Sequence, residues 1–278
     1  MCCVTDRRLI PANARVAASH LRGKVEAPRY ESGMARLVSV PVADLLHAPN
    51  GRRERQLLMG AAVTVYDIHE GHAFVQAKRD GYVGYLPETA LGGGCTTHRL
   101  TVRASHLYTR ADLKSPEICG LSLGSRVQVL REAGRFAETP YGFIPRPHLA
   151  PLEERAIDPV AVAGQFLGTP YLWGGNSAFG LDCSGLVQEA CIACGIACPG
   201  DSDLQEAALG TALPEAAPLR RGDLLFWKGH VAWVSAPDML LHANAHHMAV
   251  AYEPLAEAIR RIEAGEGPVT SRRRAGLV

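Results

Sequence analysis

Two segments of the chain carry similar residues in the same order, and this repeat constrains the fold more than any other feature. The segments are residues 60–91 and 124–149. Each has two valines separated by one residue, then an aromatic residue. Each closes on a glycine, an aromatic residue, an aliphatic residue and a proline, at residues 84–87 and 142–145. Short alternating runs bounded by glycine and proline favour β-strands, so the sequence predicts two small β modules in the N-terminal half.

This pattern resembles the bacterial SH3-like barrels, which are small β modules found beside cell-wall hydrolases. The resemblance implies barrels at residues 37–94 and 95–151, joined by the glycines at positions 92–94. A single larger β-domain over both segments is the alternative. Residues 1–36 precede the first barrel, and we expect them to form an extension with a short helix at residues 11–21.

The pattern changes after the second module. Apolar residues follow helical spacing over residues 158–166 and 182–194, whereas residues 222–251 contain short apolar runs typical of strands. Helices followed by a sheet indicate an α+β domain. We place this domain at residues 152–264, followed by a C-terminal tail at residues 265–278.

Charge and hydropathy exclude several classes of partner. The chain has 29 Lys plus Arg against 28 Asp plus Glu, and we expect its run of arginines at residues 272–274 to be solvated within the tail. Nucleic acid is therefore not an expected partner. No apolar stretch reaches the roughly 18 residues of a membrane span, and Asp6, Arg7 and Arg8 interrupt any signal peptide. We expect a soluble, cytoplasmic protein without a membrane partner.

Cys183 is the strongest candidate for a nucleophile. Leu186, Val187 and Ala190 keep helical spacing, and extending this stripe backward places Cys183 in the first turn, with Asp182 as the cap. Backbone N–H groups at a helix start favour a thiolate. We therefore expect the thiol pKa to fall from about 8.5 by one or more units.

Two histidines, His230 and His242, are placed to serve as base and orienting group. A thiolate nucleophile needs a base within hydrogen-bond reach, and the base needs a third group that fixes its tautomer. His230 opens one predicted strand and His242 ends the next. A tight turn at residues 235–237 would set the two histidines directly opposite each other, with Cβ atoms about 5 Å apart. One imidazole could then orient the other.

Other cysteines and histidines leave a metal site as an alternative. Cys191, Cys194 and Cys198 follow one another closely and are either small core residues or ligands of a metal or cluster. His246 and His247 lie near the first two histidines, so four histidines could bind zinc. Zinc hydrolysis would leave the predicted nucleophile and its flanking glycines without a role, and we expect no cofactor.

Four blocks of the C-terminal half resemble the NlpC-type family of papain-like cell-wall peptidases. They are residues 170–175, 182–187 and 221–226 and the pair His230-Val231. The resemblance implies a papain-like fold with Cys183 as nucleophile, His230 as base and His242 as the orienting third member. It also implies that Tyr171 and the Cys183 amide stabilise the oxyanion and that Trp173 contacts substrate.

A narrower resemblance concerns Asp201 and Ser202. In the γ-D-glutamyl-L-diamino-acid endopeptidases, or dipeptidyl-peptidase VI, an Asp-Ser pair at this position binds the free amine of an N-terminal L-Ala. A carboxylate and a hydroxyl can satisfy an ammonium that leaves water, and Ser184 lies beside the nucleophile. Gly200 departs from this subgroup, where arginine is common, which changes the local charge. Asp201 and Ser202 could also cap a helix from Leu204 onward.

In the same subgroup the first barrel closes the amine end of the cleft with a glutamate and a tyrosine. Glu54 and Tyr82 are the matching residues, with Tyr85 as the alternative to Tyr82. The resemblance thus implies a site that selects peptides by the distance between a free amine and the bond that is cut.

The function implied by the resemblance is that of a cysteine endopeptidase cleaving between γ-D-Glu and a diamino acid, either diaminopimelate or lysine. Its partner would be a murein-derived peptide, L-Ala-γ-D-Glu-diamino acid, met in the cytoplasm during recycling. Two alternatives stay open. One is an amidase or acyltransferase on the same fold, acting on another amide or on lipid, and the other is a non-catalytic wall-binding protein. An intact set of Cys183, His230 and His242 argues against the last.

Overall fold

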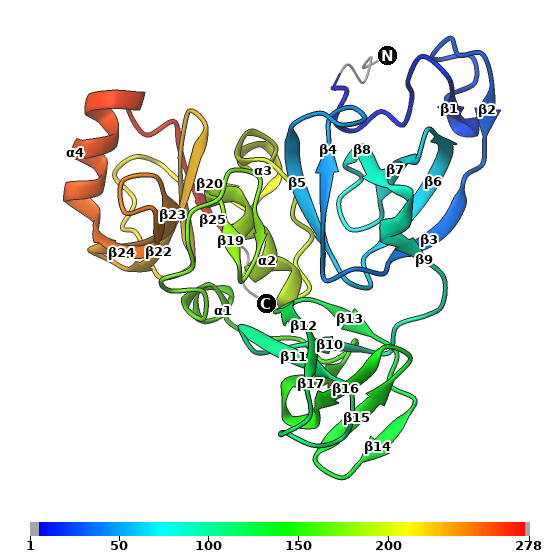
Figure 1. Cartoon of the computed structure of the whole chain (residues 1–278). Coiled ribbons are helices and arrows are strands. Elements are labelled where there is room, and N and C mark those ends of the chain that lie inside the picture. The colour runs from blue at the N-terminus through cyan, green and yellow to red at the C-terminus, as the bar shows by residue number, and fades with distance from the viewer. Residues whose placement is uncertain (1–5, 276–278) are drawn as a thin grey trace. The chain divides into compact units, whose positions relative to one another are not determined.

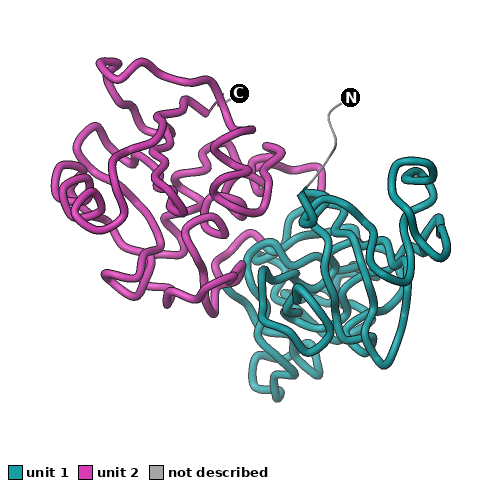
Figure 2. Tube along the Cα trace, turned by 90° about the horizontal axis from the view of Figure 1, so that it is seen from above, with its two compact units in different colours: residues 1–100, 104–151 teal, residues 101–103, 152–278 magenta. Residues whose placement is uncertain are grey.

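The computed structural model describes residues 6–275, which form two compact units (Figure 2). Unit 1 contains the chain up to residue 100 together with residues 104–151. Unit 2 contains residues 101–103 together with the chain from residue 152 onward. Within the described residues, no helix is long and apolar enough to cross a membrane.

The first part of unit 1 is an antiparallel sheet of short strands. These are β3 (Met34–Val38), β4 (Val42–Leu46), β5 (Arg53–Leu58), β6 (Ala62–His69), β7 (His72–Ala77), β8 (Val83–Pro87) and β9 (Leu91–Gly92). Their spatial order is β5-β4-β8-β7-β6-β3-β9, and the 3-10 helix η2 (Glu88–Ala90) connects β8 to β9 (Figure 1). Leu45, Leu57, Val75 and Leu86 are buried in one core cluster. Side chains that alternate between this core and the surface give the strands their period of two.

The second part of unit 1 repeats this strand order. Its strands are β10 (His98–Leu100), β11 (Ala104–Tyr108), β12 (Glu117–Ser122), β13 (Arg126–Val127), β14 (Arg131–Ala133), β15 (Phe136–Thr139), β16 (Gly142–Pro145) and β17 (Leu149–Pro151), with η3 (Arg146–His148) before β17. They form the sheets β12-β11-β16-β15-β14 and β13-β10-β17. If β13 and β14 together replace β6, this order is that of the first part. The repeat in the sequence therefore corresponds to a repeated topology.

The two parts of unit 1 contact each other through the turn at Met59 and Gly60. Met59 is buried with Leu100 and Leu121 in the core of the second part. The Arg126 N–H donates to the Met59 carbonyl oxygen at 2.8 Å. Gly60 has a φ of +77°, and a Cβ at this position would lie 2.2 Å from the Arg126 carbonyl oxygen. Only glycine fits this contact without strain.

The extension before the first sheet forms two short strands and not the predicted helix. The strands β1 (Ala17–Ala18) and β2 (Tyr30–Glu31) pair in parallel, with the 3-10 helix η1 (Ser19–Leu21) between them. The Asn13 side chain accepts hydrogen bonds from Arg15 N and Val16 N. Because this local turn competes with helical hydrogen bonds, the prediction of a helix over residues 11–21 is wrong.

Unit 2 combines one sheet with helices, the predicted α+β architecture. The sheet contains β20 (Thr211–Ala212), β21 (Asp223–Trp227), β22 (His230–Ala236), β23 (Met239–Asn244), β24 (Ala249–Pro254) and β25 (Ser271–Arg274), in the spatial order β20-β25-β21-β22-β23-β24. The helices are α1 (Pro159–Gly164), α2 (Cys183–Ala193), α3 (Ser202–Ala208) and α4 (Leu255–Glu266) (Figure 1). A small hairpin of β18 (Asn176–Ser177) and β19 (Gly180–Leu181) precedes α2. Helix α4 packs on the sheet through Ala258 and Ile262, which share a core cluster with Leu225.

The arginines near the C-terminus form a strand of this sheet and not a solvated tail. Strand β25 lies between β20 and β21, and Arg274 pairs with Asp223 in antiparallel register. The Arg274 guanidinium donates to both Asp223 carboxylate oxygens at 2.9 Å. A domain boundary at residue 264 would remove this strand from the sheet, so the prediction of a tail is wrong.

Candidate active site

The helix that carries the predicted nucleophile begins at a side-chain cap. Asp182 Oδ1 accepts a hydrogen bond from Gly185 N at 2.6 Å, and Oδ2 accepts one from Gly174 N at 2.9 Å. A Cβ on Gly185 would lie 2.2 Å from the Gly175 carbonyl oxygen, so glycine is needed where the loop passes the helix start. The predicted cap is confirmed, and it makes Cys183 the first residue of α2.

Cys183 lies against the strand that carries His230. Its sulfur is 3.9 Å from the Gly229 carbonyl oxygen, and the Val231 N–H is hydrogen-bonded to it. The thiol therefore contacts the backbone on both sides of the histidine. Burial, reinforced by the charge of Asp182, raises the pKa of the thiol to about 12 against the opposing effect of backbone N–H groups. The predicted fall in the thiol pKa is wrong because burial outweighs the helix start, and a base must take the proton as the thiolate forms.

His230 and His242 are hydrogen-bonded partners on neighbouring strands. His230 Nε2 lies 2.9 Å from His242 Nδ1. The prediction that they stand directly opposite is wrong, because Trp233 pairs with Leu241 and sets His242 level with Ala232. The turn lies at residues 237–238, between the paired Ala236 and Met239, and a β-bulge between Val234 and Ala236 shifts the register further. The two imidazoles still meet because side chains on diagonal positions of one sheet face remain within reach.

Two residues that were not predicted from the sequence extend the hydrogen bonds of the histidine pair. His242 Nε2 donates to Glu253 Oε2 on β24 at 2.9 Å. Arg261 on α4 donates to both Glu253 oxygens, from Nε at 2.9 Å and from Nη2 at 2.7 Å. Glu253 lies beyond the predicted strands of residues 222–251, and no local pattern connects Arg261 to them. The pairing of β23 with β24 brings both residues to the histidines.

Burial and neighbouring charges keep both histidines neutral in the resting site. Burial, followed by the charges of His242 and Arg261, lowers the pKa of His230 from 6.5 to about 3. Burial also lowers the pKa of His242, against the opposing hydrogen bond to Glu253. Burial alone would raise the pKa of Glu253, but the hydrogen bonds from Arg261 and His242 hold it well below its usual range. At neutral pH the site therefore contains a neutral thiol, two neutral imidazoles and an ionised carboxylate.

Tyr171 lies close enough to Cys183 for a charge on the sulfur to affect the pKa of the phenol. Burial, followed by the charges of Cys183 and Asp182, raises the pKa of Tyr171 well above its ordinary value of 10. The phenol therefore stays protonated and can donate a hydrogen bond. Its backbone N–H donates to the Met248 carbonyl oxygen at 2.9 Å, which holds the residue in place. The Trp173 side chain, by contrast, is 72% exposed and is therefore accessible to a bound molecule.

The segment that holds these side chains is similar to a known family. Residues 168–261 match the NlpC/P60 family, and residues 45–91 match the bacterial dipeptidyl-peptidase SH3 domain. The C-terminal domain belongs to the NlpC/P60 family. Its matched range runs from just before Tyr171 to Arg261, so the residues described above all fall within it.

The chain is also similar to curated proteins with related names. It is 37% identical over 87 residues to dipeptidyl-peptidase 6 of Lysinibacillus sphaericus, covering 31% of each chain. It is 32% identical over 199 residues to the gamma-D-glutamyl-L-lysine dipeptidyl-peptidase of Bacillus subtilis, covering 64% of this chain and 66% of the relative. The chain thus spans less than two thirds of either relative. A crystal structure of an NlpC/P60 family protein from Bacillus cereus shares the fold, with a TM-score of 0.74, 23% identity, and coverage of 88% of this chain and 100% of the other.

The predicted amine-binding residues of the NlpC/P60 domain lie at the start of α3. Ser202 is the first residue of the helix and is buried, and Asp201 precedes it. Within the described residues the Asp201 carboxylate makes no capping hydrogen bond to α3. The Ser184 hydroxyl donates to Asp182 Oδ1 at 2.9 Å, so it supports the cap of α2. Amine binding by Asp201, Ser202 and Ser184 stays a prediction from the resemblance.

Two buried glutamines tie this segment to the nucleophile helix. Gln205 Nε2 donates to the carbonyl oxygens of Ser184 at 2.9 Å and Pro199 at 3.0 Å. Gln188 Nε2 donates to the carbonyl oxygen of Cys198 at 3.1 Å. Both glutamines are 0% exposed. The chain leading into α3 is therefore anchored to α2 by interior hydrogen bonds.

The residues predicted to close the amine end lie in unit 1. Glu54 forms an ion pair with Arg7, whose Nη1 is 3.1 Å from Glu54 Oε2. Tyr82 is buried in the core of the first sheet. The Tyr85 hydroxyl accepts a hydrogen bond from Asn13 Nδ2 at 3.0 Å. Substrate binding by Glu54 and by Tyr82 or Tyr85 stays a prediction from the resemblance.

The metal-site alternatives find little support in the described residues. Cys191 and Cys198 are buried, and the cysteines of this region are free thiols. Within residues 6–275, the potential ligands that lie within 4.8 Å of one another are those of His242, His247 and Glu253. Neither the alternative cysteine cluster nor the alternative four-histidine set forms such a group in the part of the chain that the structure describes.

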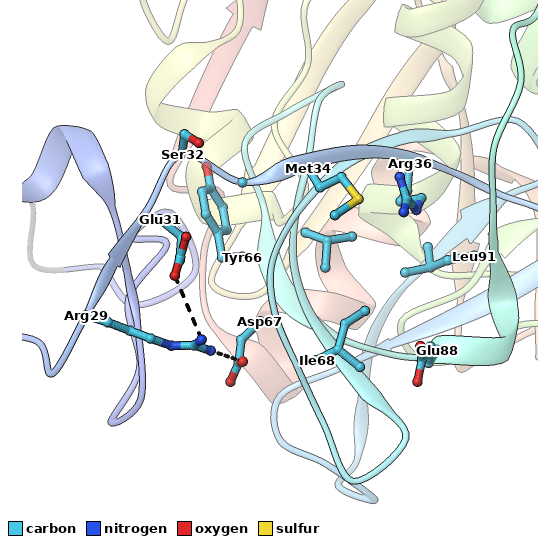
Figure 3. Close-up of a pocket in the computed structure, with 12 residues that line it drawn as sticks. Arg29, Glu31, Ser32, Met34, Arg36, Tyr66, Asp67, Ile68, Glu88 and Leu91 are labelled. Carbon is cyan, nitrogen blue, oxygen red and sulfur yellow. Dashed lines mark hydrogen bonds and ion pairs between the residues drawn. The ribbon is translucent and has the colours of Figure 1, made fainter.

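A separate cavity of about 570 Å³ lies beside β3 and β6 in unit 1 (Figure 3). It is lined by Arg29, Glu31, Ser32, Gly33, Met34, Arg36, Val65, Tyr66, Asp67, Ile68, Glu88 and Leu91. Asp67 on its wall is ion-paired with both Arg29 and Arg15. The lining includes none of the predicted site residues, and its acids and bases largely offset each other, so it does not indicate a particular ligand.

Proposed function

We propose that the protein is a cysteine endopeptidase that hydrolyses the bond between γ-D-Glu and a diamino acid in murein peptides with a free N-terminal L-Ala. The observation that carries this proposal is the position of the Cys183 sulfur against the backbone on either side of His230, whose imidazole is hydrogen-bonded to His242. A thiol, a base and an orienting group in this order are the parts of a cysteine peptidase. The name of the Bacillus subtilis relative, a gamma-D-glutamyl-L-lysine dipeptidyl-peptidase, supports the choice of bond.

In the proposed mechanism the Cys183 thiol proton passes to His230 Nδ1 as Sγ attacks the γ-carbonyl carbon. The Cys183 N–H and the Tyr171 hydroxyl donate hydrogen bonds to the resulting oxyanion. His230 then protonates the leaving amine, the C–N bond breaks, and a thioester remains. Water gives a proton to His230 and attacks the thioester, which releases L-Ala-γ-D-Glu and restores the thiol.

Selectivity for a free amine is assigned to Asp201 and Ser202. An ammonium that leaves water needs a carboxylate and hydrogen-bond acceptors to offset its desolvation. Gln205, which joins α3 to the first turn of α2, would hold the amine site at a constant distance from Cys183. Such a site would select short peptides by their length.

We also propose that the second part of unit 1 is a second SH3-like barrel. Its strands follow the order of the first part, which contains the matched SH3 domain. The 3-10 helices η2 and η3 occupy equivalent positions before the last strand of each part.

Free murein peptides arise during wall recycling, and we propose that the protein acts on them in the cytoplasm.

The experiment that tests the function compares L-Ala-γ-D-Glu-diaminopimelate with its N-acetylated form, using the purified full chain and chromatography of the products. We expect hydrolysis of the free peptide only, release of the dipeptide L-Ala-γ-D-Glu, and complete loss of turnover in Cys183→Ala. Equal hydrolysis of both peptides would favour the amidase alternative. Turnover by Cys183→Ala would overturn the assignment of the nucleophile.

A further inference from the structure

The second histidine of the pair, His242, is hydrogen-bonded to Glu253, a carboxylate that its surroundings keep ionised. Glu253 is 5% exposed, and both of its oxygens accept hydrogen bonds from Arg261. A buried carboxylate with a bidentate guanidinium partner keeps its negative charge and has a fixed orientation. Glu253 therefore meets His242 only as a hydrogen-bond acceptor.

This acceptor determines which nitrogen of His242 carries the proton. The distance from His242 Nε2 to Glu253 Oε2 is 2.9 Å. Because an ionised carboxylate has no hydrogen to donate, His242 Nε2 must be protonated. In a neutral imidazole the other nitrogen then has a free lone pair. His242 Nδ1 is therefore the acceptor in its contact with His230.

The tautomer of His230 follows from that of His242. His230 Nε2 lies 2.9 Å from His242 Nδ1, so it must donate its hydrogen there. The lone pair of the neutral His230 imidazole is then on Nδ1. That is the tautomer required of a base, because the nitrogen that is not used to orient the ring is free to take a proton.

We propose that Glu253, held by Arg261, is a positioning residue that fixes the tautomers of both histidines and leaves His230 Nδ1 able to accept the Cys183 proton. The inference rests on the proposed function, because it assigns the base of that reaction. Glu253 acts through His242 and His230 and does not itself contact the reacting atoms.

The same residues have the composition of a metal site, but Arg261 argues against that use. His242, His247 and Glu253 offer ligand atoms within 4.8 Å of one another. A divalent cation there would compete with the Arg261 guanidinium, which already supplies the positive charge to both carboxylate oxygens. It would also bind His242 Nε2 in place of the proton, which would reverse both tautomers. Positioning of the base is therefore the better-supported role.

Glu253 also contributes charge to the step in which His230 becomes an imidazolium. The titratable groups that act on the histidine pair are Glu253, Arg261 and His247. Asp182 acts on Cys183, and both of these residues act on Tyr171. Of the charged side chains that act on His230, Glu253 favours the imidazolium and Arg261 opposes it. Loss of the carboxylate charge should destabilise the imidazolium that protonates the leaving amine.

The first test is the pH dependence of kcat/KM for the free peptide in Glu253→Gln, which is isosteric but uncharged. We expect a loss of about a hundredfold and an acidic limb of the profile displaced about one pH unit lower, because His230 acts as a base only while it is unprotonated. Asp223→Asn is the matched control. Asp223 is also a buried carboxylate whose two oxygens accept hydrogen bonds from one arginine, but this arginine is Arg274. The control should retain the position of both limbs.

A second variant guards against misfolding of the first. In Glu253→Met with Arg261→Met both charges of the buried pair are removed, which is often neutral for stability. We expect this variant to fold and to lose activity as Glu253→Gln does. Retention of wild-type kcat/KM and of the acidic limb in both variants would overturn the proposal.

The last test does not depend on turnover. Long-range nitrogen–proton NMR spectra of the full chain distinguish protonated from unprotonated imidazole nitrogens, with His242→Gln used for assignment. We expect a hydrogen on Nε2 of both His230 and His242 at neutral pH. A hydrogen on Nδ1 of His242 would refute the inference. Failure of the peptide assay, with the tautomers as expected, would instead count against the proposed function.

Discussion

The side-chain amide of Gln205 donates a hydrogen bond to the carbonyl oxygen of Ser184 at 2.9 Å, and this contact joins α3 to the first turn of α2. The same amide donates to the Pro199 carbonyl oxygen. One buried side chain thus fixes the distance between the nucleophile and the segment that carries Asp201. A change in that distance should affect substrate position more than the chemistry at the thiol.

Gln205→Leu should therefore weaken binding of the free-amine peptide. We expect KM to rise about tenfold with little change in kcat, because the reacting groups stay in place while the amine site loosens. Steady-state kinetics on L-Ala-γ-D-Glu-diaminopimelate measure both constants. Gln188→Leu is the matched control, since Gln188 is equally buried but bonds to the Cys198 carbonyl oxygen. An equal rise in KM for both variants would indicate general loosening and contradict the specific role of Gln205.

The raised pKa of Cys183 predicts that its reactivity depends on His230. Burial makes the isolated thiolate unfavourable at neutral pH, so alkylation at Cys183 requires a base that takes the proton. In His230→Ala we expect the rate of iodoacetamide labelling at Cys183 to fall at least about tenfold at pH 7. Peptide mass spectrometry measures labelling at each cysteine.

Cys95 serves as an internal control for this labelling experiment. It is an exposed free thiol in unit 1, so its rate should be the same in the wild type and in His230→Ala. Unchanged labelling of Cys183 in the variant would show that the thiol ionises without the histidine, contrary to the environment described above.

The parts of the site that follow from local chemistry could be predicted from the sequence. The cap at Asp182, the helix that starts at Cys183 and the two strands that carry His230 and His242 all depend on residues close together in the chain. The contact between the two histidines was predicted for the same reason. The register could not be predicted, because the position of the turn and the β-bulge beside Ala236 move every opposing pair along the strand.

The parts that depend on distant segments could not be predicted in this way. Glu253 reaches His242 only through the pairing of β23 with β24, and Arg261 reaches Glu253 only because α4 packs on that sheet. The thiol pKa was misjudged since burial is a property of the whole domain and a helix start is a local one. Arg274 likewise gains its role from Asp223, which lies 51 positions away.

Acid stability gives a further prediction. The pKa of His230 is lowered from 6.5 to about 3 in the folded protein, so between these values the unfolded chain binds a proton that the native state does not. The free energy of unfolding should therefore be highest above pH 6.5 and fall on acidification, by about 1.4 kcal/mol per pH unit for this one group. Urea denaturation at pH 7 and pH 4.5 measures the change. His230→Gln removes the titrating group and should lose less stability over this interval than the wild type does; an equal loss would contradict the assignment.

A pair of glycines tests the contact between the two parts of unit 1. Gly60 and Gly71 have nearly the same φ, +77° and +74°, so alanine at either position carries a similar backbone cost of about 1–2 kcal/mol. A Cβ at Gly71 would have no atom within 4 Å, whereas one at Gly60 would lie 2.2 Å from the Arg126 carbonyl oxygen. Gly60→Ala should therefore reduce the free energy of unfolding by about 1–3 kcal/mol more than Gly71→Ala does, because the backbone of the second part must move. Urea denaturation of the two variants measures this difference, and equal values would mean that the turn at Gly60 does not make the contact with Arg126 in solution.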